Sequence, residues 1–178
     1  MQLAHLLLRH APLGAVLHEA AEPHIGRGIE VIFTVSGVPL EAREPLILRR
    51  PELIHGVRNL VQNAVDFARS AVWIDGEWTA DRLIVRIVDD GEGYPPNLLG
   101  RIGDPFVRSR RADQDLARRP EYEGMGLGLF IAKTLLERTG ARLVFANARP
   151  PSGPAAAGGA AQVAPGHGKA AVFHQLLQ

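Results

Sequence analysis

The sequence contains no cysteine, and this absence excludes several kinds of chemistry. Without thiols the chain can form no disulfide framework, no thiolate metal site and no cysteine nucleophile, and it suits a reducing compartment. Its seven histidines are scattered and show no HExxH or comparable ligand spacing, which disfavours a structural metal ion. The composition therefore indicates neither disulfide nor zinc chemistry.

A strong charge imbalance and long apolar runs are also missing. The net charge of +1 leaves no basic surplus, so we expect no nucleic-acid partner. No apolar run approaches the roughly 18 residues of a membrane span, and the N-terminus shows no signal-peptide pattern. We expect a soluble, cytoplasmic chain, which could be a piece of a longer protein anchored elsewhere. Its 178 residues, 46% of them hydrophobic, predict one domain with a substantial core.

The apolar periodicity predicts helices and strands in a mixed order. The N-terminal 24 residues are mostly helix-compatible, with an interruption at Pro12. Two further helices are predicted, from Pro51 to about Ala68 and from about residue 125 to Gly140. Strands are predicted at residues 27–36, 45–49, 71–78, 82–90, 141–148 and 169–177, with 71–78 and 82–90 as an antiparallel pair. The pattern predicts an α+β fold, a two-layer α/β sandwich with a mostly antiparallel sheet and about three helices on one face.

Two segments lack a long periodic element. Residues 91–124 are rich in Gly, Pro, Arg and Asp, and a connection of this length is uncommon unless it is functional or mobile. Residues 149–168 are of low complexity and are predicted to be disordered. We assign no function to this second segment.

Four patches carry the candidate chemistry, and the first is RNLVQNAVDFA on the long helix. Asn59 and Asn63 are four residues apart and share a helix face, although asparagine costs helix propensity. A neutral amide oxygen suits Mg²⁺, which keeps waters and takes further ligands from substrate phosphates. The alternative interpretation is a pair of solvent-facing amides.

The second patch is VDDGEGYP, at the end of the strand that precedes it. Asp89 is followed by Gly91 and Gly93, so a carboxylate is expected to point into a cleft with a glycine floor. Such a carboxylate can accept a hydrogen bond from an exocyclic amine such as that of adenine. A simple Gly-Asp turn is the alternative.

The third patch is GDPFVRSRRADQDLARRP. Asp104 and Pro105 predict a turn, and Phe106 offers an apolar anchor. A mobile arginine-rich segment could close over polyphosphate, whereas the alternative is a solvated loop. The arginines are Arg108, Arg110, Arg111, Arg118 and Arg119.

The fourth patch, EGMGLGLFIAK, places Gly124, Gly126 and Gly128 directly before a helix. Such glycines allow close backbone approach, and a helix N-terminus binds anions. The patch is not a Walker A motif, because GxxxxGK[ST] is absent, and it is not GxGxxG, because its third glycine comes one residue early. A flexible glycine turn is the alternative.

In this order the patches resemble the N, G1, F and G2 boxes of bacterial sensor histidine kinases. The matching stretches are NLVQNA, DDGEG, DPF and GMGLGL, and the likeness covers roughly residues 25–177. It implies the histidine-kinase ATPase (Bergerat) type of sandwich, which gyrase, Hsp90 and MutL share. More narrowly, RNLVQNAVDFARS and EGMGLGLFIAKTLLERTGA resemble redox-responsive sensor kinases of the RegB/PrrB type.

The resemblance implies roles for individual residues, with Mg-ATP as the ligand. Asn63 would ligate Mg²⁺ and Asn59 would line the phosphate side. Asp89 would receive the adenine amino group, while Gly91 and Gly93 leave room for the base.

The remaining roles concern a lid at residues 105–123. Phe106 would anchor its front, and Arg108 is a candidate cation beside the phosphates. The three glycines of the fourth patch, together with Leu127, would hinge the lid and offer backbone N–H groups to the phosphates, reinforced by the helix dipole.

Two departures from the family pattern carry information. Hydrolysing relatives have a glutamate one turn before the magnesium-binding asparagine, where this chain has Asn59, which cannot act as a general base. Many sensor kinases have a phosphate-binding Lys or Arg at the position of Asp66, so another cation must replace it, with Arg58, Arg69 and Arg108 as candidates. Phe67 likewise replaces a polar aromatic residue or a histidine.

A phospho-acceptor motif is missing, because HLLLRHAPL (5–13) has the wrong spacing and no acidic neighbour beside either histidine. We therefore expect residues 1–24 to be the end of a dimerisation region or a linker, and residues 25–178 to be the catalytic ATP-binding domain. The predicted activity is transfer of the γ-phosphoryl group of Mg-ATP to a histidine outside this chain, for relay to a response regulator. The full-length protein would be a membrane-anchored homodimer, and this piece a monomer. The alternatives are a gyrase- or MutL-like ATPase and a catalytically silent nucleotide-binding module.

Overall fold

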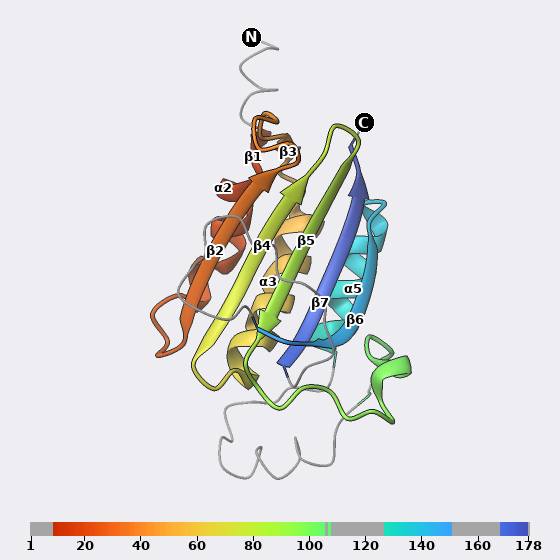
Figure 1. The fold of residues 1–178 in the computed structure, drawn as a ribbon. Helices are drawn as coiled ribbons and strands as arrows, with labels where there is room; N and C mark the ends of the chain where they lie inside the picture. The colour runs from red at the N-terminus through yellow and green to blue at the C-terminus, as the bar shows by residue number, and fades with distance from the viewer. Residues whose placement is uncertain (1–8, 106, 108–126, 151–167, 178) are drawn as a thin grey trace.

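The structure is a computed structural model that describes residues 9–105, 107, 127–150 and 168–177. Figure 1 shows the path of the chain. Its elements in chain order are β1 (His10–Pro12), α2 (Leu13–Ala21), the 3₁₀ turn η1 (Glu22–His24), β2 (Glu30–Gly37), β3 (Leu46–Leu48), α3 (Pro51–Phe67), β4 (Ala71–Trp78), β5 (Arg82–Asp89), the 3₁₀ turn η2 (Leu99–Arg101), α5 (Gly128–Arg138), β6 (Arg142–Ala148) and β7 (Gly168–Leu176).

The described elements form two layers. A five-stranded sheet has the order β2-β4-β5-β7-β6, and β1 and β3 form a separate two-stranded sheet. Within the large sheet β2 and β4 run parallel, and every other neighbouring pair is antiparallel. The helices α2, α3 and α5 cover one face of this sheet (Figure 1). The predicted two-layer α+β sandwich and the antiparallel pairing of β4 with β5 are both confirmed.

The central helix α3 forms as its apolar pattern predicts. Pro51 occupies its first turn beside Glu52, where a missing N–H costs nothing and an acidic side chain complements the helix dipole. The side chains of the predicted stripe then point into the core between the layers. Buried residues of α3 are Leu53, Ile54, Gly56, Val57, Leu60, Val61, Ala64 and Val65.

The predicted division of the chain between residues 24 and 25 does not correspond to a domain boundary in the structure. Pro12 ends β1, and α2 begins at the next residue, so the proline separates a strand from a helix instead of interrupting a helix. β1 pairs with β3. Five residues of α2 belong to the same hydrophobic core as α3 and the sheet: Leu13, Val16, Leu17, Ala20 and Ala21.

Smaller differences concern element ends. β2 begins at Glu30 because residues 25–29 form a turn, whereas the sequence predicts a strand from residue 27. α5 covers Gly128–Arg138, slightly shorter than predicted. Among the described helices none is both long and apolar enough to cross a membrane.

We predict that Leu17→Ala lowers the free energy of unfolding by about 2–5 kcal/mol, because it leaves a cavity in the core. The Leu17 side chain is 1% exposed, whereas Leu40 is 78% exposed, so Leu40→Ala serves as the control and should change stability by less than about 0.5 kcal/mol. Urea unfolding measures both. Equal effects of the two substitutions would show that α2 is a dispensable linker.

Candidate functional site

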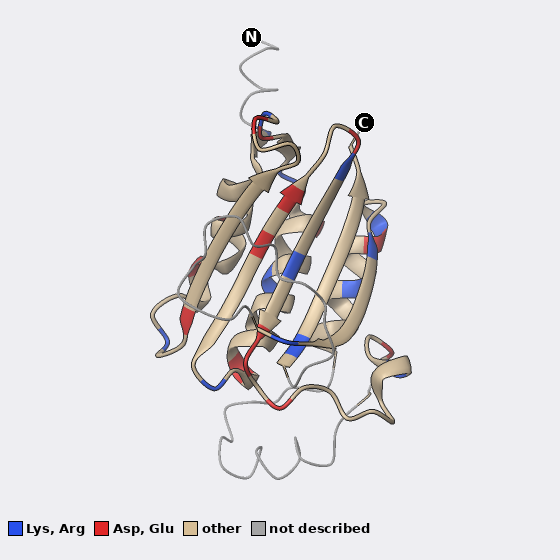
Figure 2. Ribbon diagram, viewed as in Figure 1, with Lys and Arg blue, Asp and Glu red and all other residues tan. Residues whose placement is uncertain are grey.

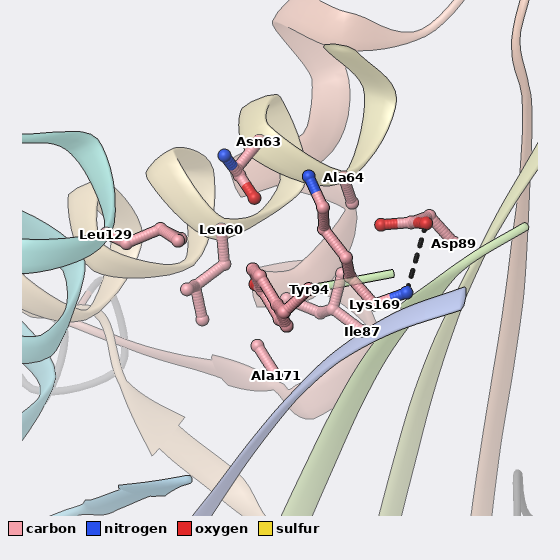
Figure 3. A pocket seen from close by; sticks show the side chains of 9 residues that line it. All are labelled: Leu60, Asn63, Ala64, Ile87, Asp89, Tyr94, Leu129, Lys169 and Ala171. Atoms are coloured by element: carbon pink, nitrogen blue, oxygen red, sulfur yellow. Dashed lines mark hydrogen bonds between the residues drawn. The ribbon is translucent and has the colours of Figure 1, made fainter. Parts of the chain in front are cut away.

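A small cavity lies between the helical layer and the sheet, near the end of β5. Its volume is about 10 Å³, about the space of one water molecule. Figure 3 shows side chains from α3, β5, the following loop, α5 and β7 converging on it. The lining residues are Leu60, Asn63, Ala64, Ile87, Asp89, Tyr94, Leu129, Lys169 and Ala171.

Asp89 is the buried acid of this cavity, with 1% of its surface exposed. Its Oδ1 accepts a hydrogen bond from the Gly91 N–H at 2.8 Å and one from the Lys169 N–H at 3.2 Å, which Figure 3 marks. Its Oδ2 is buried and has no hydrogen-bond partner among the described residues. Burial raises the pKa of Asp89, although these two N–H groups and the Lys169 charge act in the opposite direction. An unsatisfied buried oxygen is costly, so Oδ2 is a place where a ligand N–H can bind.

The neighbouring Asp90 has a structural role instead. Its Oδ1 accepts hydrogen bonds from the N–H groups of Arg69 at 2.7 Å and Ser70 at 3.0 Å, and its Oδ2 from the Ser70 hydroxyl at 2.5 Å. Burial acts to raise the pKa of Asp90, but the hydrogen bonds from Ser70, Ala71 and Arg69 outweigh it and hold the pKa below its ordinary value. Asp90 therefore ties the connection between α3 and β4 to the end of β5.

The glycines after Asp89 shape the loop below the cavity. A Cβ atom at Gly91 would collide with the carbonyl oxygen of Phe67, at the end of α3. Gly93 has a φ of +77°, a left-handed conformation that favours glycine. The backbone conformation of the loop thus explains why glycine occupies both positions. Their predicted role beside a base stays a prediction.

The two asparagines of α3 differ in position. Asn63 lines the cavity together with Asp89, so two site residues predicted from separate patches meet. Asn59 is not among the lining residues, and its Nδ2 donates a hydrogen bond to the backbone oxygen of His55 at 2.9 Å. The shared helix face predicted for the pair therefore brings only Asn63 to the cavity.

Lys169, the second residue of β7, is a site residue that the sequence did not suggest. Its Nζ lies 3.1 Å from the centroid of the Phe67 ring and 5.3 Å from that of Tyr94. Burial lowers the pKa of Lys169 to about 8, although Asp89, Asp66 and Glu92 attract its charge. No sequence pattern indicates this role, because Lys169 directly follows the low-complexity segment and belongs to no motif.

Lys169 is a further candidate for the cation that must replace the phosphate-binding Lys or Arg, because this chain has Asp66 at that position. Arg58 and Arg69, two predicted replacements, are not among the lining residues of the cavity. Lys169 is the lysine whose charge interacts with Asp66. Figure 2 shows the acidic end of β5 beside the basic start of β7, strands that pair from Arg82 with Leu176 to Val88 with Ala170.

Tyr94 is a second residue that the predictions missed, although it lies in the quoted stretch VDDGEGYP. Its backbone N–H donates to the side-chain oxygen of Asn147 at 2.6 Å, and its carbonyl accepts from the Asn147 amide at 2.9 Å. Its ring meets Phe145 edge-on, with centroids 6.2 Å apart. β6 therefore fixes the loop that closes the cavity.

The first turn of α5 also borders the cavity, through Leu129. The helix begins at Gly128, and Leu127 before it provides no side-chain cap; the N–H groups of a first helical turn can bind an anion. A Cβ atom at Gly128 would meet nothing within 4 Å among the described atoms. The predicted site residues Phe106, Arg108, Gly124 and Gly126 lie outside the described residues, as do most of the predicted lid and of the segment 149–168.

Comparison with known proteins identifies the class to which this fold and site belong. Residues 49–176 match the family described as histidine kinase-, DNA gyrase B- and HSP90-like ATPases. This match covers more than half of the chain, so the chain belongs to that family, as its four patches predict.

Within the family the chain is 70% identical, over 147 residues, to the sensor histidine kinase RegB of Cereibacter sphaeroides. The alignment covers 82% of this chain and 32% of RegB, so the chain spans about a third of the length of that relative. The sensor protein QseC of Escherichia coli O157:H7 is 32% identical over 75% of this chain and 26% of its own length. The predicted resemblance to sensor kinases of the RegB type is confirmed.

Solved structures show the same fold at lower identity. Full-length ShkA in complex with AMPPNP matches with a TM-score of 0.64 and 22% identity, over 93% of this chain and 30% of that one. The mycobacterial sensor histidine kinase MprB matches with a TM-score of 0.64 and 20% identity, over 94% of this chain and 97% of that one. At these identities the likeness shows the fold alone.

We predict that Asp90→Ala destabilises the domain at neutral pH by about 1–3 kcal/mol, because it leaves the turn N–H groups without their acceptor. Since folding lowers the pKa of Asp90, its stabilisation is present above the ordinary aspartate pKa of about 3.9 and is lost as the pH falls through the lower folded value. The difference between wild type and variant should therefore shrink on acidification. Urea unfolding at several pH values measures it, and a constant difference would contradict the assignment.

Proposed function

We propose that this domain binds Mg-ATP and positions its γ-phosphoryl group for transfer to a histidine outside this chain. The observation that carries the proposal is the buried, partnerless Oδ2 of Asp89, which faces a cavity shared with Asn63 in the fold of an ATPase family. The relative RegB, by its name a sensor histidine kinase, supports the kinase form of the proposal.

Recognition of the base follows from the chemistry of Asp89. An ionised carboxylate oxygen accepts hydrogen bonds and donates none, so Oδ2 suits the exocyclic amine of adenine. A guanine in the same position would present a carbonyl oxygen there, which the carboxylate repels. Apolar side chains from α3, β5 and β7, namely Leu60, Ile87 and Ala171, complete the walls for a purine ring.

The residues present also fit a magnesium ion, provided that the nucleotide supplies most of its ligands. No three His, Asp or Glu side chains of the described residues are close enough to hold a metal ion by themselves. Asn63 would contribute one neutral oxygen, and phosphates and waters the others. The bound ion would neutralise negative charge on the phosphates, while the uncapped first turn of α5 would donate N–H groups to them.

The presence of Asn59 favours transfer of the phosphoryl group over hydrolysis of ATP. In hydrolysing relatives a glutamate at this position activates the attacking water, and an amide cannot take a proton in that way. The Asn59 amide is in addition bonded to its own helix, at His55. The nucleotide would stay intact until an acceptor histidine arrives, so catalysis would consist of positioning and charge neutralisation.

The partners of this reaction belong to the full-length protein. We propose a dimerisation and phospho-acceptor domain of the same kinase, and a response regulator that takes the phosphoryl group onward. We also propose that the full-length protein is a membrane-anchored homodimer with a redox-linked signal, a proposal supported by the likeness to RegB, of which this chain covers 32%. This domain by itself would be a monomer without a sensing function.

For Asp89→Asn we expect the affinity for ATP to fall about 10- to 100-fold and the preference for ATP over GTP to disappear, because a charge-assisted hydrogen bond to the base is lost. Folding should be preserved. Since burial raises the pKa of Asp89, its ionisation lowers stability as the pH rises through that value, so the variant should be at least as stable at neutral pH. Calorimetric titration and thermal unfolding measure the two effects. An unchanged ATP/GTP preference would contradict the assignment.

For Asn63→Ala and Asn63→Asp we expect the magnesium-dependent part of ATP binding to disappear. The alanine variant removes the metal ligand, and the aspartate variant places a charge beside the phosphates. Titrations of ATP with and without Mg²⁺ separate this part from binding of the base, which adenosine measures alone. Asn59→Ala is the matched control for catalysis: it should leave phosphate release negligible, since Asn59 activates no water in this proposal.

The proposed reaction itself is tested by incubating the domain with labelled ATP and an acceptor fragment containing the dimerisation helices. Labelled phosphohistidine is expected, with negligible phosphate release from the domain alone. Rapid release of phosphate would favour a gyrase-like ATPase. Nucleotide binding without transfer would favour a silent regulatory module.

A further inference from the structure

The cavity beside Asp89 is far too small for the base that the proposed function requires. Its volume of about 10 Å³ holds about one water molecule, whereas an adenine ring is about as large as an indole. Lys169 and Tyr94 line this cavity together with Asn63 and Asp89. Figure 3 shows the Lys169 side chain extending between Asp89 and Asn63.

Several contacts hold the ammonium group in this position. The Phe67 ring lies 3.1 Å from Nζ and the Tyr94 ring 5.3 Å, and cations are attracted to aromatic faces. The carboxylates of Asp89, Asp66 and Glu92 also attract the charge, against the cost of burial. These contacts hold the Lys169 side chain at the wall of the cavity.

Hydrogen bonds and sheet pairing fix the backbone of Lys169, whereas its side chain is held by non-covalent contacts that a rotation can break. The Lys169 N–H donates to Asp89 Oδ1, and the residue pairs with Asn147 of β6 in the sheet register. The four-carbon side chain can rotate without moving β7, because its flexible stem carries no backbone hydrogen bond. Opening the cavity therefore requires a side-chain movement and no rearrangement of the sheet.

We propose that Lys169 is an affinity-determining residue that occupies the base pocket of the nucleotide-free domain and must be displaced from the Phe67 ring when the base binds. The inference rests on the proposed function, because it concerns the same pocket. Binding of the base must replace the contacts that Lys169 makes, so the lysine weakens the affinity of the pocket.

Adenosine is the ligand that isolates this effect. It carries the base but no phosphates, so loss of a nearby cation does not itself weaken its binding electrostatically. We expect Lys169→Ala to bind adenosine about threefold or more tightly than wild type, because no cation–π contact has to be broken. Lys169→Arg keeps a cation that can stack on Phe67 and should remain close to wild type.

Arg82→Ala is the charge control. Arg82 is the exposed first residue of β5, at the end opposite Asp89, and its removal changes the net charge by the same amount as Lys169→Ala. Calorimetric titration of adenosine into the three variants and the wild type should give tighter binding for Lys169→Ala alone. Equal or weaker binding by Lys169→Ala would overturn the proposal.

The displacement can be observed directly in the wild-type protein. The sequence contains two lysines, Lys133 and Lys169, so selective ¹³C labelling of lysine gives two εCH₂ signals. A lysine over a ring face should have εCH₂ protons shifted upfield by the ring current, with Lys133 as the internal reference. Adenosine should move the Lys169 signal towards that of Lys133. An upfield signal that saturating adenosine leaves in place would overturn the proposal.

The outcomes separate this inference from the proposed function. If the wild type binds Mg-ATP and Lys169→Ala binds adenosine no better, the proposed function stands and the role of Lys169 is refuted. If the wild type fails to bind Mg-ATP but Lys169→Ala binds adenosine, the role of Lys169 is supported, whereas the proposed function fails for the wild-type chain. If neither protein binds ATP or adenosine, the proposed function fails and this inference fails with it.

Discussion

The site depends on one buried carboxylate with two unlike oxygens. Oδ1 of Asp89 joins the loop after β5 to the start of β7, through the N–H groups of Gly91 and Lys169. Oδ2 has no partner among the described residues and faces the cavity. Because hydrogen bonds to the first oxygen fix the carboxylate, the second oxygen is held in a fixed direction. A stabilising contact and a recognition contact thus share one side chain.

The surrounding elements hold this carboxylate between the helical layer and the sheet. The apolar stripe of α3 fills the core and carries Asn63 to the cavity wall. Asp90 fastens the end of α3 to the same strand end, and Asn147 of β6 fastens the loop at Tyr94. The nucleotide-free pocket is nevertheless small, and in our proposal Lys169, whose ammonium group lies over Phe67, must move when the base binds. A preorganised acid and a displaceable cation therefore act in opposite directions on affinity, and the balance between them is a property of this chain's own residues.

Much of the fold follows from local sequence patterns. The 3.6-residue period of α3 and the alternation in β4 and β5 are strong, and both predictions are confirmed. The sequence did not predict that α2 packs into the same core as α3, because helical character alone does not say which core a helix joins. The ordered patches identified Asn63 and Asp89 as neighbours. They placed Asn59 on the same helix face, but spacing does not say which turn of the helix reaches the cavity, and only Asn63 lines it.

The sequence by itself determined the family, the kinds of ligand-binding groups and their order along the chain, because motif spacing and apolar period are local properties. Only the tertiary structure decided which of the two aspartates at the end of β5 faces the cavity and which ties the turn. It also decided that Lys169, 80 residues from Asp89, lies beside it. Strand pairing between β5 and β7 makes that contact, and pairing between distant strands is set by the packing of the whole sheet, which leaves no periodic trace in either segment.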